Sequence, residues 1–186
     1  MLAKCPFGEK LVTVVFNIGY EGTDVERFIE TLKVVGIEYL ADVRAIPHSR
    51  KKGFSKRGLA ERLSQAGIRY EHFVELGDPK NGREAARSGD YPKFRRIYEK
   101  HIDSAVARAA LERLTEVASA AITCMLCFER DPRTCHRSII AERLGAIGHD
   151  SFELYGDDPE RYRRHRSKLP RSRIGKGAAP PEHETR

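Results

Sequence analysis

The sequence predicts an α/β protein with an open, mostly parallel sheet of about five strands, helices on both faces, and Rossmann-like layering. Short apolar or β-branched runs alternate with segments of helical periodicity along residues 12–155. Glycines follow several of these segments, as turns and helix ends require. Hydrophobic residues make up 40% and charged residues 33% of the 186-residue chain, which favours a soluble domain with a real core.

Patterns at the start of the chain predict a strand and then a helix. Residues 12–18 form a β-branched run that stops at Gly19, which indicates a strand. Thr23 and Glu26 have the spacing of a capping box, which opens a helix that continues to Val35. The same criteria predict the remaining elements in chain order: strand 37–43, loop 47–55, helix 56–66, strand 68–76, polar loop 78–90 with one helical turn, helical segment 91–119 broken near residues 103–104, strand 121–127, a helix from Ser138, and strand 151–155.

Charge is distributed unevenly along the chain. Residues 161–186 hold nine Lys/Arg and two Asp/Glu, so they account for the whole net charge of +7. We expect a single domain over residues 1–160 and a disordered basic tail over residues 161–186. Such a tail either attracts nucleic acid without sequence specificity or serves only solubility.

The cysteines and the hydropathy of the chain indicate the cellular compartment in which the protein is expected. No apolar run has the length of a membrane span, and the first ten residues do not resemble a signal peptide. Four cysteines, three of them clustered, suit a reducing environment. We therefore expect a cytoplasmic protein with no membrane partner. We expect no cofactor.

Polar residues gather where the predicted strands end. In a parallel α/β sheet these ends share one edge, where ligands bind. The segment 127–138 packs two thiols, an imidazole, three guanidiniums and two carboxylates into twelve residues, between a strand and a helix. The side chains and glycine that we expect to bind a substrate at this edge are Gly19, Tyr20, Glu21, Asp42, Arg44, Ser49, Arg50, Phe54, Arg137 and Ser138.

Four motifs carry a family resemblance: residues 17–22, 42–50, 53–56, and 127–129 together with 135–138. In order and spacing they resemble the domain-of-unknown-function 488 family, over about residues 12–155. The resemblance implies an α/β fold and a cytoplasmic, mostly prokaryotic protein, and it implies no established reaction. Phe128 and Asp78 depart from the residues that are common at their positions in similar sequences.

Cys135 is the candidate nucleophile. A predicted helix start and the neighbouring His136 and Arg137 all favour its thiolate. His136 or Glu129 would carry the proton, and the arginines would hold an anionic group. The alternative is a cysteine that only packs. The Cys-x5-Arg spacing of cysteine phosphatases is absent, because position 141 is alanine.

A metal site is a second interpretation. Cys127, Cys135 and His136 are suitable zinc ligands, and His72 or His48 would complete the set. Cys124 does not belong to it, because residues three apart on a strand point to opposite faces.

The segment 48–57 is the one dense basic patch before the tail. Its arginines and lysines suit phosphates, with a base stacked on Phe54, whereas the alternative is a charged loop that Phe54 anchors to the core. Two function classes follow: an enzyme that acts on an anionic substrate, such as a nucleotide or nucleic acid, or a non-catalytic phosphate-binding module.

Overall fold

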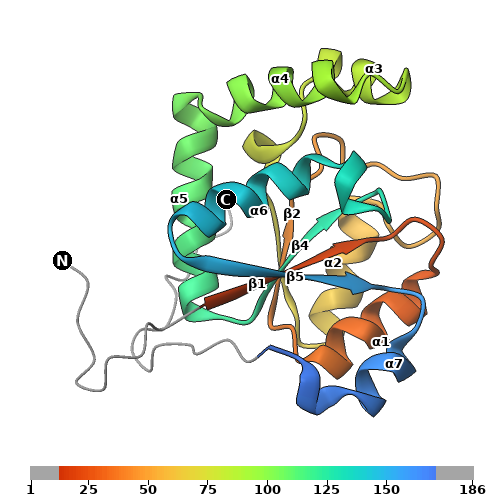
Figure 1. The fold of residues 1–186 in the computed structure, drawn as a ribbon. Helices are drawn as coiled ribbons and strands as arrows, with labels where there is room; N and C mark the ends of the chain where they lie inside the picture. Colours follow the sequence, from red (N-terminus) through yellow and green to blue (C-terminus); the bar gives the residue numbers. More distant parts are fainter. Residues whose placement is uncertain (1–12, 171–186) are drawn as a thin grey trace, which may run out of the picture.

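The computed structural model describes residues 13–170 and has an α/β fold built on one open sheet (Figure 1). All five strands run parallel, in the order β3-β2-β4-β1-β5. The strands are β1 Thr13–Gly19, β2 Tyr39–Asp42, β3 Arg69–His72, β4 Thr123–Cys127 and β5 His149–Tyr155. Because β4 pairs with both β1 and β2, the segment that follows β4 lies between the ends of these two strands.

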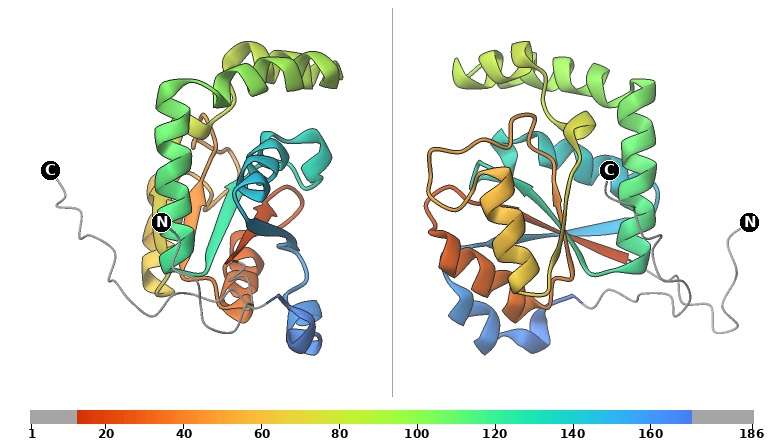
Figure 2. Two further views of the ribbon diagram at one scale, coloured as in Figure 1. Left: turned by 60° about the vertical axis from the view of Figure 1, so that its left-hand side comes forward. Right: turned by 180° about the vertical axis from the view of Figure 1, so that it is seen from behind.

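Helices cover both faces of the sheet, as the sequence predicts (Figures 1 and 2). On one face of the sheet lie α1 and α2, and on the other lie α5 and α6. Helices α3 and α4 follow one another beyond the N-terminal end of α5. The helices are α1 Val25–Val35, α2 Lys56–Gln65, α3 Lys80–Arg87, α4 Tyr91–Ile102, α5 Ala105–Ala120, α6 His136–Ala146 and α7 Pro159–Arg164. Single 3-10 turns are η1 Val74–Leu76, η2 Pro132–Thr134 and η3 Arg166–Lys168.

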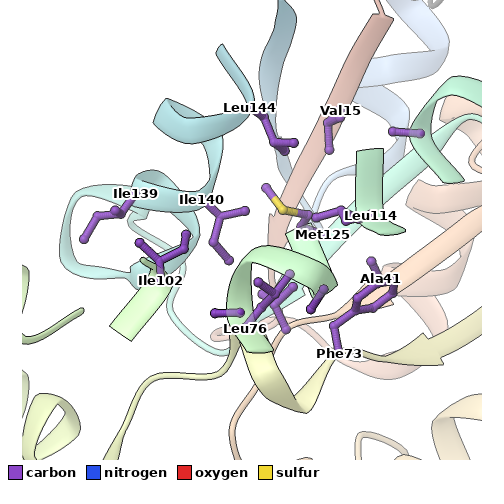
Figure 3. Close-up of a cluster of buried hydrophobic side chains, with 14 of the residues drawn as sticks. Val15, Ala41, Phe73, Leu76, Ile102, Leu114, Met125, Ile139, Ile140 and Leu144 are labelled. Carbon is purple, nitrogen blue, oxygen red and sulfur yellow. The ribbon is translucent and has the colours of Figure 1, made fainter. Parts of the chain in front are cut away.

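The sheet separates two hydrophobic cores. Met125 of β4 faces α5 and α6, where it packs with Leu114 and Ile140 (Figure 3). Its neighbours along β4, Cys124 and Leu126, face the core of α1 and α2. Since successive strand residues point to opposite faces, a strand buried on both faces reads as a continuous apolar run.

The predicted element order is confirmed, and boundaries differ by a few residues. The break near residues 103–104 is confirmed: Ser104 caps α5 by accepting a hydrogen bond from the backbone N–H of Ala107. In α1 the cap is Asp24 rather than Thr23, because the hydroxyl of Thr23 donates to the carbonyl of Gly156 at 2.8 Å.

Two predicted segments differ more. The strand expected over residues 68–76 ends at His72 and continues as η1, which turns the chain away from the sheet. The loop expected over residues 78–90 contains α3, a helix of eight residues. These differences matter because α3 forms one wall of the cavity described below.

The folded domain extends past residue 160. In α7, Tyr162 is buried and its hydroxyl accepts a hydrogen bond from the backbone N–H of Tyr155. Arg163 pairs with Glu30 of α1. The first part of the segment expected to be a free tail therefore packs against the domain, and the expectation for residues 171–186 lies outside the described residues. Within residues 13–170, none of the helices has the length and apolar character needed to cross a membrane.

Candidate functional site

The site begins where β4 ends at Cys127. The loop after β4 is joined to the loop after β1, because the backbone N–H of Glu21 donates to the carbonyl of Phe128 at 2.9 Å. A Cβ atom at Gly19 would lie 1.8 Å from the carbonyl oxygen of Glu129. Only glycine allows this approach, so the role of Gly19 is to let the two loops meet.

Arg137 holds the loop from inside the protein. Its side chain is fully buried, and its guanidinium donates to the backbone carbonyls of Glu129 and Arg130. Glu153 of β5 lies 3.5 Å from the same guanidinium. These contacts make Arg137 a structural residue that fixes the loop between β4 and α6.

Cys127, Cys135 and His136 form a compact cluster. The Sγ atoms of Cys127 and Cys135 lie 3.7 and 3.8 Å from Nδ1 of His136. All three ligand-type atoms lie within 4.8 Å of one another. Nε2 of His136 donates to the carbonyl of Val43 at 2.8 Å, because a carbonyl can only accept, and this bond fixes the orientation of the ring.

Electrostatics distinguish the two thiols. Burial alone would raise the pKa of Cys135, but the neighbouring Cys127 thiol and the positive charges of His136 and Arg137 hold it well below the usual value. Burial, Cys135 and the carboxylate of Glu129 raise the pKa of Cys127 well above that value. Burial lowers the pKa of His136, and the Cys135 thiolate more than reverses this and raises it to about 9.

Two carboxyl groups lie beside the cluster. Oε2 of Glu129 accepts a hydrogen bond from the Cys127 thiol at 2.9 Å. Burial, followed by the charge of Cys135, raises the pKa of Glu129 to about 7. Burial also raises the pKa of Asp78, at the start of the segment that leads into α3. A group with a pKa of about 7 can both accept and donate a proton near neutral pH.

A cavity of about 500 Å³ opens above the cluster. Its floor includes Cys127, Glu129, His136 and Asp78. Its walls come from the loops after β1, β2 and β4 and from α3 with the start of α4. The wall residues are Tyr20, Arg44, Ala45, Ile46, His48, Ser49, Arg50, Arg83, Ala86, Arg87, Tyr91, Phe128 and Thr134.

A scan against protein-family models matches residues 24–144 to the domain of unknown function DUF488. This range covers well over half of the chain. The protein belongs to the DUF488 family. Searches of curated proteins and of solved structures find no match. The family model covers β2, β3, β4 and all but the last two residues of α6, so the floor of the cavity lies within this DUF488 domain.

Several predicted site residues of this DUF488 protein meet at the cavity. Of the proposed catalytic residues, Glu129 and His136 line it, whereas Cys135 is 1% exposed and lies behind them. The thiol that lines the cavity is that of Cys127, on its floor. The predicted substrate-binding residues that line the cavity are Tyr20, Arg44, Ser49 and Arg50.

Other predicted residues have structural roles. Glu21 accepts a hydrogen bond from the backbone N–H of Arg130, and Ser138 donates to the carbonyl of Cys135. Asp42 is fully buried and pairs with Arg44 at 2.6 Å. His72, considered as a further metal ligand, bonds instead to the carbonyl of Arg44.

Phe54 corrects one expectation. Its ring is fully buried and stacks on Tyr20, with a centroid separation of 4.3 Å. It has no free face for a base. Phe54 instead anchors the basic loop to the core, which is the alternative that the sequence left open.

Arg83, Arg87 and Tyr91 line the cavity although the sequence pattern did not place them at the site. Residues 78–90 were expected to form mainly a loop, so the sequence did not predict that Arg83 and Arg87 lie on one face of a helix. Their spacing of four residues is the signal that places both on one side of a helix.

Proposed function

We propose that this DUF488 protein is an enzyme that acts on a small phosphate-bearing substrate, such as a nucleotide, bound in the cavity. The observation that carries the proposal is the combination of cationic walls with a floor of thiol, imidazole and carboxyl groups. A volume of about 500 Å³ lies within the range of small-molecule sites.

The cationic wall supports an anionic ligand. Arg50 and Arg87 are exposed, and neither forms an ion pair with a carboxylate among residues 13–170. Arg44 differs, because Asp42 already balances its charge. Arg50 and Arg87 are therefore the residues that we expect to contact a phosphate group directly.

Exposed rings favour a ligand with a planar or apolar part. Phe128 is 44% exposed and Tyr91 is 42% exposed, and both line the cavity. Phe128 meets Tyr20 edge to face, with centroids 5.2 Å apart. An aromatic base can stack on such rings while its phosphate reaches the arginines.

The floor supports catalysis rather than binding alone. Glu129 lines the cavity and can transfer a proton, whereas the ring nitrogens of His136 already contact Val43 and the two sulfurs. Cys127 presents a thiol to the cavity. Direct attack by Cys135, the nucleophile expected from the sequence, requires the substrate to pass Cys127 and His136. We therefore assign the reactive chemistry to the cluster as a unit.

The first test is ligand binding by the full chain. Inorganic phosphate and a panel of nucleoside mono- and diphosphates are titrated, with calorimetric detection. We expect Arg87→Ala and Arg50→Ala each to weaken binding about tenfold, because each removes a charged hydrogen-bond donor. Arg108→Ala, on the exposed face of α5 outside the cavity, is the control and keeps the wild-type affinity. Absence of binding across the panel contradicts the proposal.

Turnover then separates an enzyme from a binding module. Each bound compound is incubated with wild type and with Glu129→Gln, and products are followed by phosphorus NMR and mass spectrometry. Product from wild type and none from Glu129→Gln, at unchanged affinity, supports the enzyme. Tight binding without product supports the non-catalytic phosphate-binding module.

A further inference from the structure

The proposed function does not explain the close spacing of three metal-binding atoms in the site, which belong to Cys127, Cys135 and His136. Two thiol sulfurs lie 3.7 and 3.8 Å from Nδ1 of His136. These separations are those of weak hydrogen bonds to sulfur, so the cluster by itself is held only by weak bonds among the three atoms. For a tetrahedral zinc ion, bonds of about 2.3 Å to sulfur and 2.0–2.1 Å to nitrogen place ligand atoms about 3.6 Å apart. The cluster therefore has the dimensions of a metal site.

The histidine is oriented as a metal ligand. Nε2 donates to the carbonyl of Val43 at 2.8 Å, which leaves Nδ1 directed at the two sulfurs. Histidines that bind metals commonly donate their second ring N–H to a carbonyl or carboxylate in this way. Tyr98 packs against the same ring, with centroids 5.2 Å apart, and limits its rotation.

We propose that Sγ of Cys127, Sγ of Cys135 and Nδ1 of His136 bind one zinc ion at the floor of the cavity. Two thiolates and one imidazole are a donor set that zinc prefers and that magnesium and calcium do not. The inference goes beyond the proposed function, because metal binding is measurable without a substrate.

The fourth position of this ion faces the cavity. Cys127 and His136 line the cavity, and Cys135 lies behind them. Three protein ligands with an open position are the arrangement of catalytic rather than structural zinc sites. A zinc ion held there would supply a Lewis acid to a group bound in the cavity, beside the carboxyl group of Glu129.

The surrounding structure holds the ligands in place before a metal binds. Cys127 ends β4, and Cys135 and His136 begin α6. Arg137 fixes the connecting loop through the carbonyls of Glu129 and Arg130. Such preorganisation means that the metal orders little additional chain.

Zinc binding by the full chain tests the proposal, with matched alanine variants on one strand. Cys127→Ala and Cys124→Ala each remove a buried thiol from β4, but Cys124 belongs to the core on the opposite face. Affinity is measured by competition with a chromophoric chelator, in the presence of a phosphine reductant. We expect wild type and Cys124→Ala to bind one zinc per chain with submicromolar affinity.

We expect Cys127→Ala to lose more than about 100-fold in affinity, since loss of an outer-shell partner alone costs 10–100-fold. Circular dichroism verifies that each variant is folded. Equal affinity of the two alanine variants overturns the proposal, as does a wild-type dissociation constant above about 10 μM.

Cobalt(II) supplies a measurement on wild type that needs no variant. We expect intense thiolate-to-cobalt charge-transfer absorption in the near ultraviolet and visible bands typical of tetrahedral coordination. Bound cobalt without thiolate bands overturns the proposal. Neither experiment involves a substrate or the phosphate-binding residues Arg50 and Arg87. A protein that binds no zinc can therefore be distinguished from one that binds no phosphate-bearing substrate.

Discussion

Two buried polar groups lie at the same edge of the sheet and differ in how their atoms are paired. On β2 and β3, Asp42 accepts hydrogen bonds from Arg44 at 2.8 and 2.6 Å and from the hydroxyl of Tyr70 at 2.6 Å. Arg44 also donates to the carbonyl of Phe54. On β4 and α6, the sulfurs of Cys127 and Cys135 contact Nδ1 of His136 at 3.7 and 3.8 Å, and the Cys127 thiol also donates to Glu129 at 2.9 Å.

We infer from this difference that the two groups have different roles. A buried charge is tolerated when its partners lie within the protein, and the Asp42–Arg44–Tyr70 group meets that condition. It fixes the loops that frame the cavity. The Cys127–Cys135–His136 cluster holds its sulfur and nitrogen atoms together only by weak hydrogen bonds to sulfur, on the floor of a cavity. A bound metal ion would replace these weak bonds with stronger ones.

Breaking the paired group should have the largest effect on stability. Arg44→Met removes the guanidinium and leaves the fully buried Asp42 carboxylate without its ionic partner. We expect a loss of about 3–5 kcal/mol in the free energy of unfolding, measured with urea. A loss below about 1 kcal/mol would mean that the pair does not hold the edge together.

Gly19→Ala tests whether the close approach of two loops supports the cluster. The added Cβ would overlap the carbonyl of Glu129, so the loop after β4 must move. We expect a loss of about 3 kcal/mol in stability, as in overpacked cores, together with weaker zinc binding.

The matched control for that substitution is Gly58→Ala, in the first turn of α2, where an added Cβ meets no atom within 4 Å. It should raise stability by about 0.5–1 kcal/mol and leave zinc binding unchanged. Similar behaviour of the two variants would contradict the role assigned to Gly19.

Tyr70→Phe removes one hydroxyl from the Asp42–Arg44–Tyr70 group and leaves its two charges in place. The hydroxyl of Tyr70 donates to Oδ2 of Asp42. We expect a loss of about 1.5 kcal/mol in urea unfolding, the lower end for a hydrogen bond to a charged group. Zinc affinity should not change, because neither residue belongs to the cluster. Reduced zinc binding in this variant would show that the two groups are not independent.

We expect the smallest effect on stability from His149, which lacks the hydrogen bonds that hold the ring of His136. His149 is buried, and its Nδ1 has no hydrogen-bond partner among residues 13–170. Burial lowers its pKa, so the folded state favours the neutral ring. This contribution to stability is complete above about pH 6.5, the unfolded value, and is lost as the pH falls through the lower folded value.

Urea unfolding of wild type and His149→Gln between pH 5 and 7.5 measures this contribution. The decline in stability toward pH 5 should be shallower in the variant, because glutamine does not titrate. An identical pH dependence in both proteins would remove His149 from the account.

The fold and the location of the site were predictable from sequence, because each rests on local patterns. Apolar runs that end in polar residues placed the strands, and parallel order then placed Cys127, Asp42 and Gly19 at one edge. The role of each residue was less predictable. Phe54 looks like a ligand-stacking ring in sequence, but its burial depends on Tyr20, which lies 34 residues earlier in the chain.

The wall formed by α3 was missed for a different reason. Residues 80–87 contain few apolar side chains, so the segment resembles a polar loop in sequence, although its two buried residues, Gly82 and Ala85, share one helical face. Their orientation depends on packing against α4, which no local pattern specifies. The convergence of Cys135 and His136 on Cys127 likewise depends on the path of the intervening loop and on its fixation by Arg137.

The most direct test of the account is the position of zinc in crystals of the full chain grown with the metal. Diffraction data collected on both sides of the zinc absorption edge give an anomalous difference map. The account predicts one strong peak about 2.3 Å from the sulfurs of Cys127 and Cys135 and about 2.0–2.1 Å from Nδ1 of His136. A well-ordered cluster without such a peak, or zinc bound only elsewhere on the chain, would contradict it.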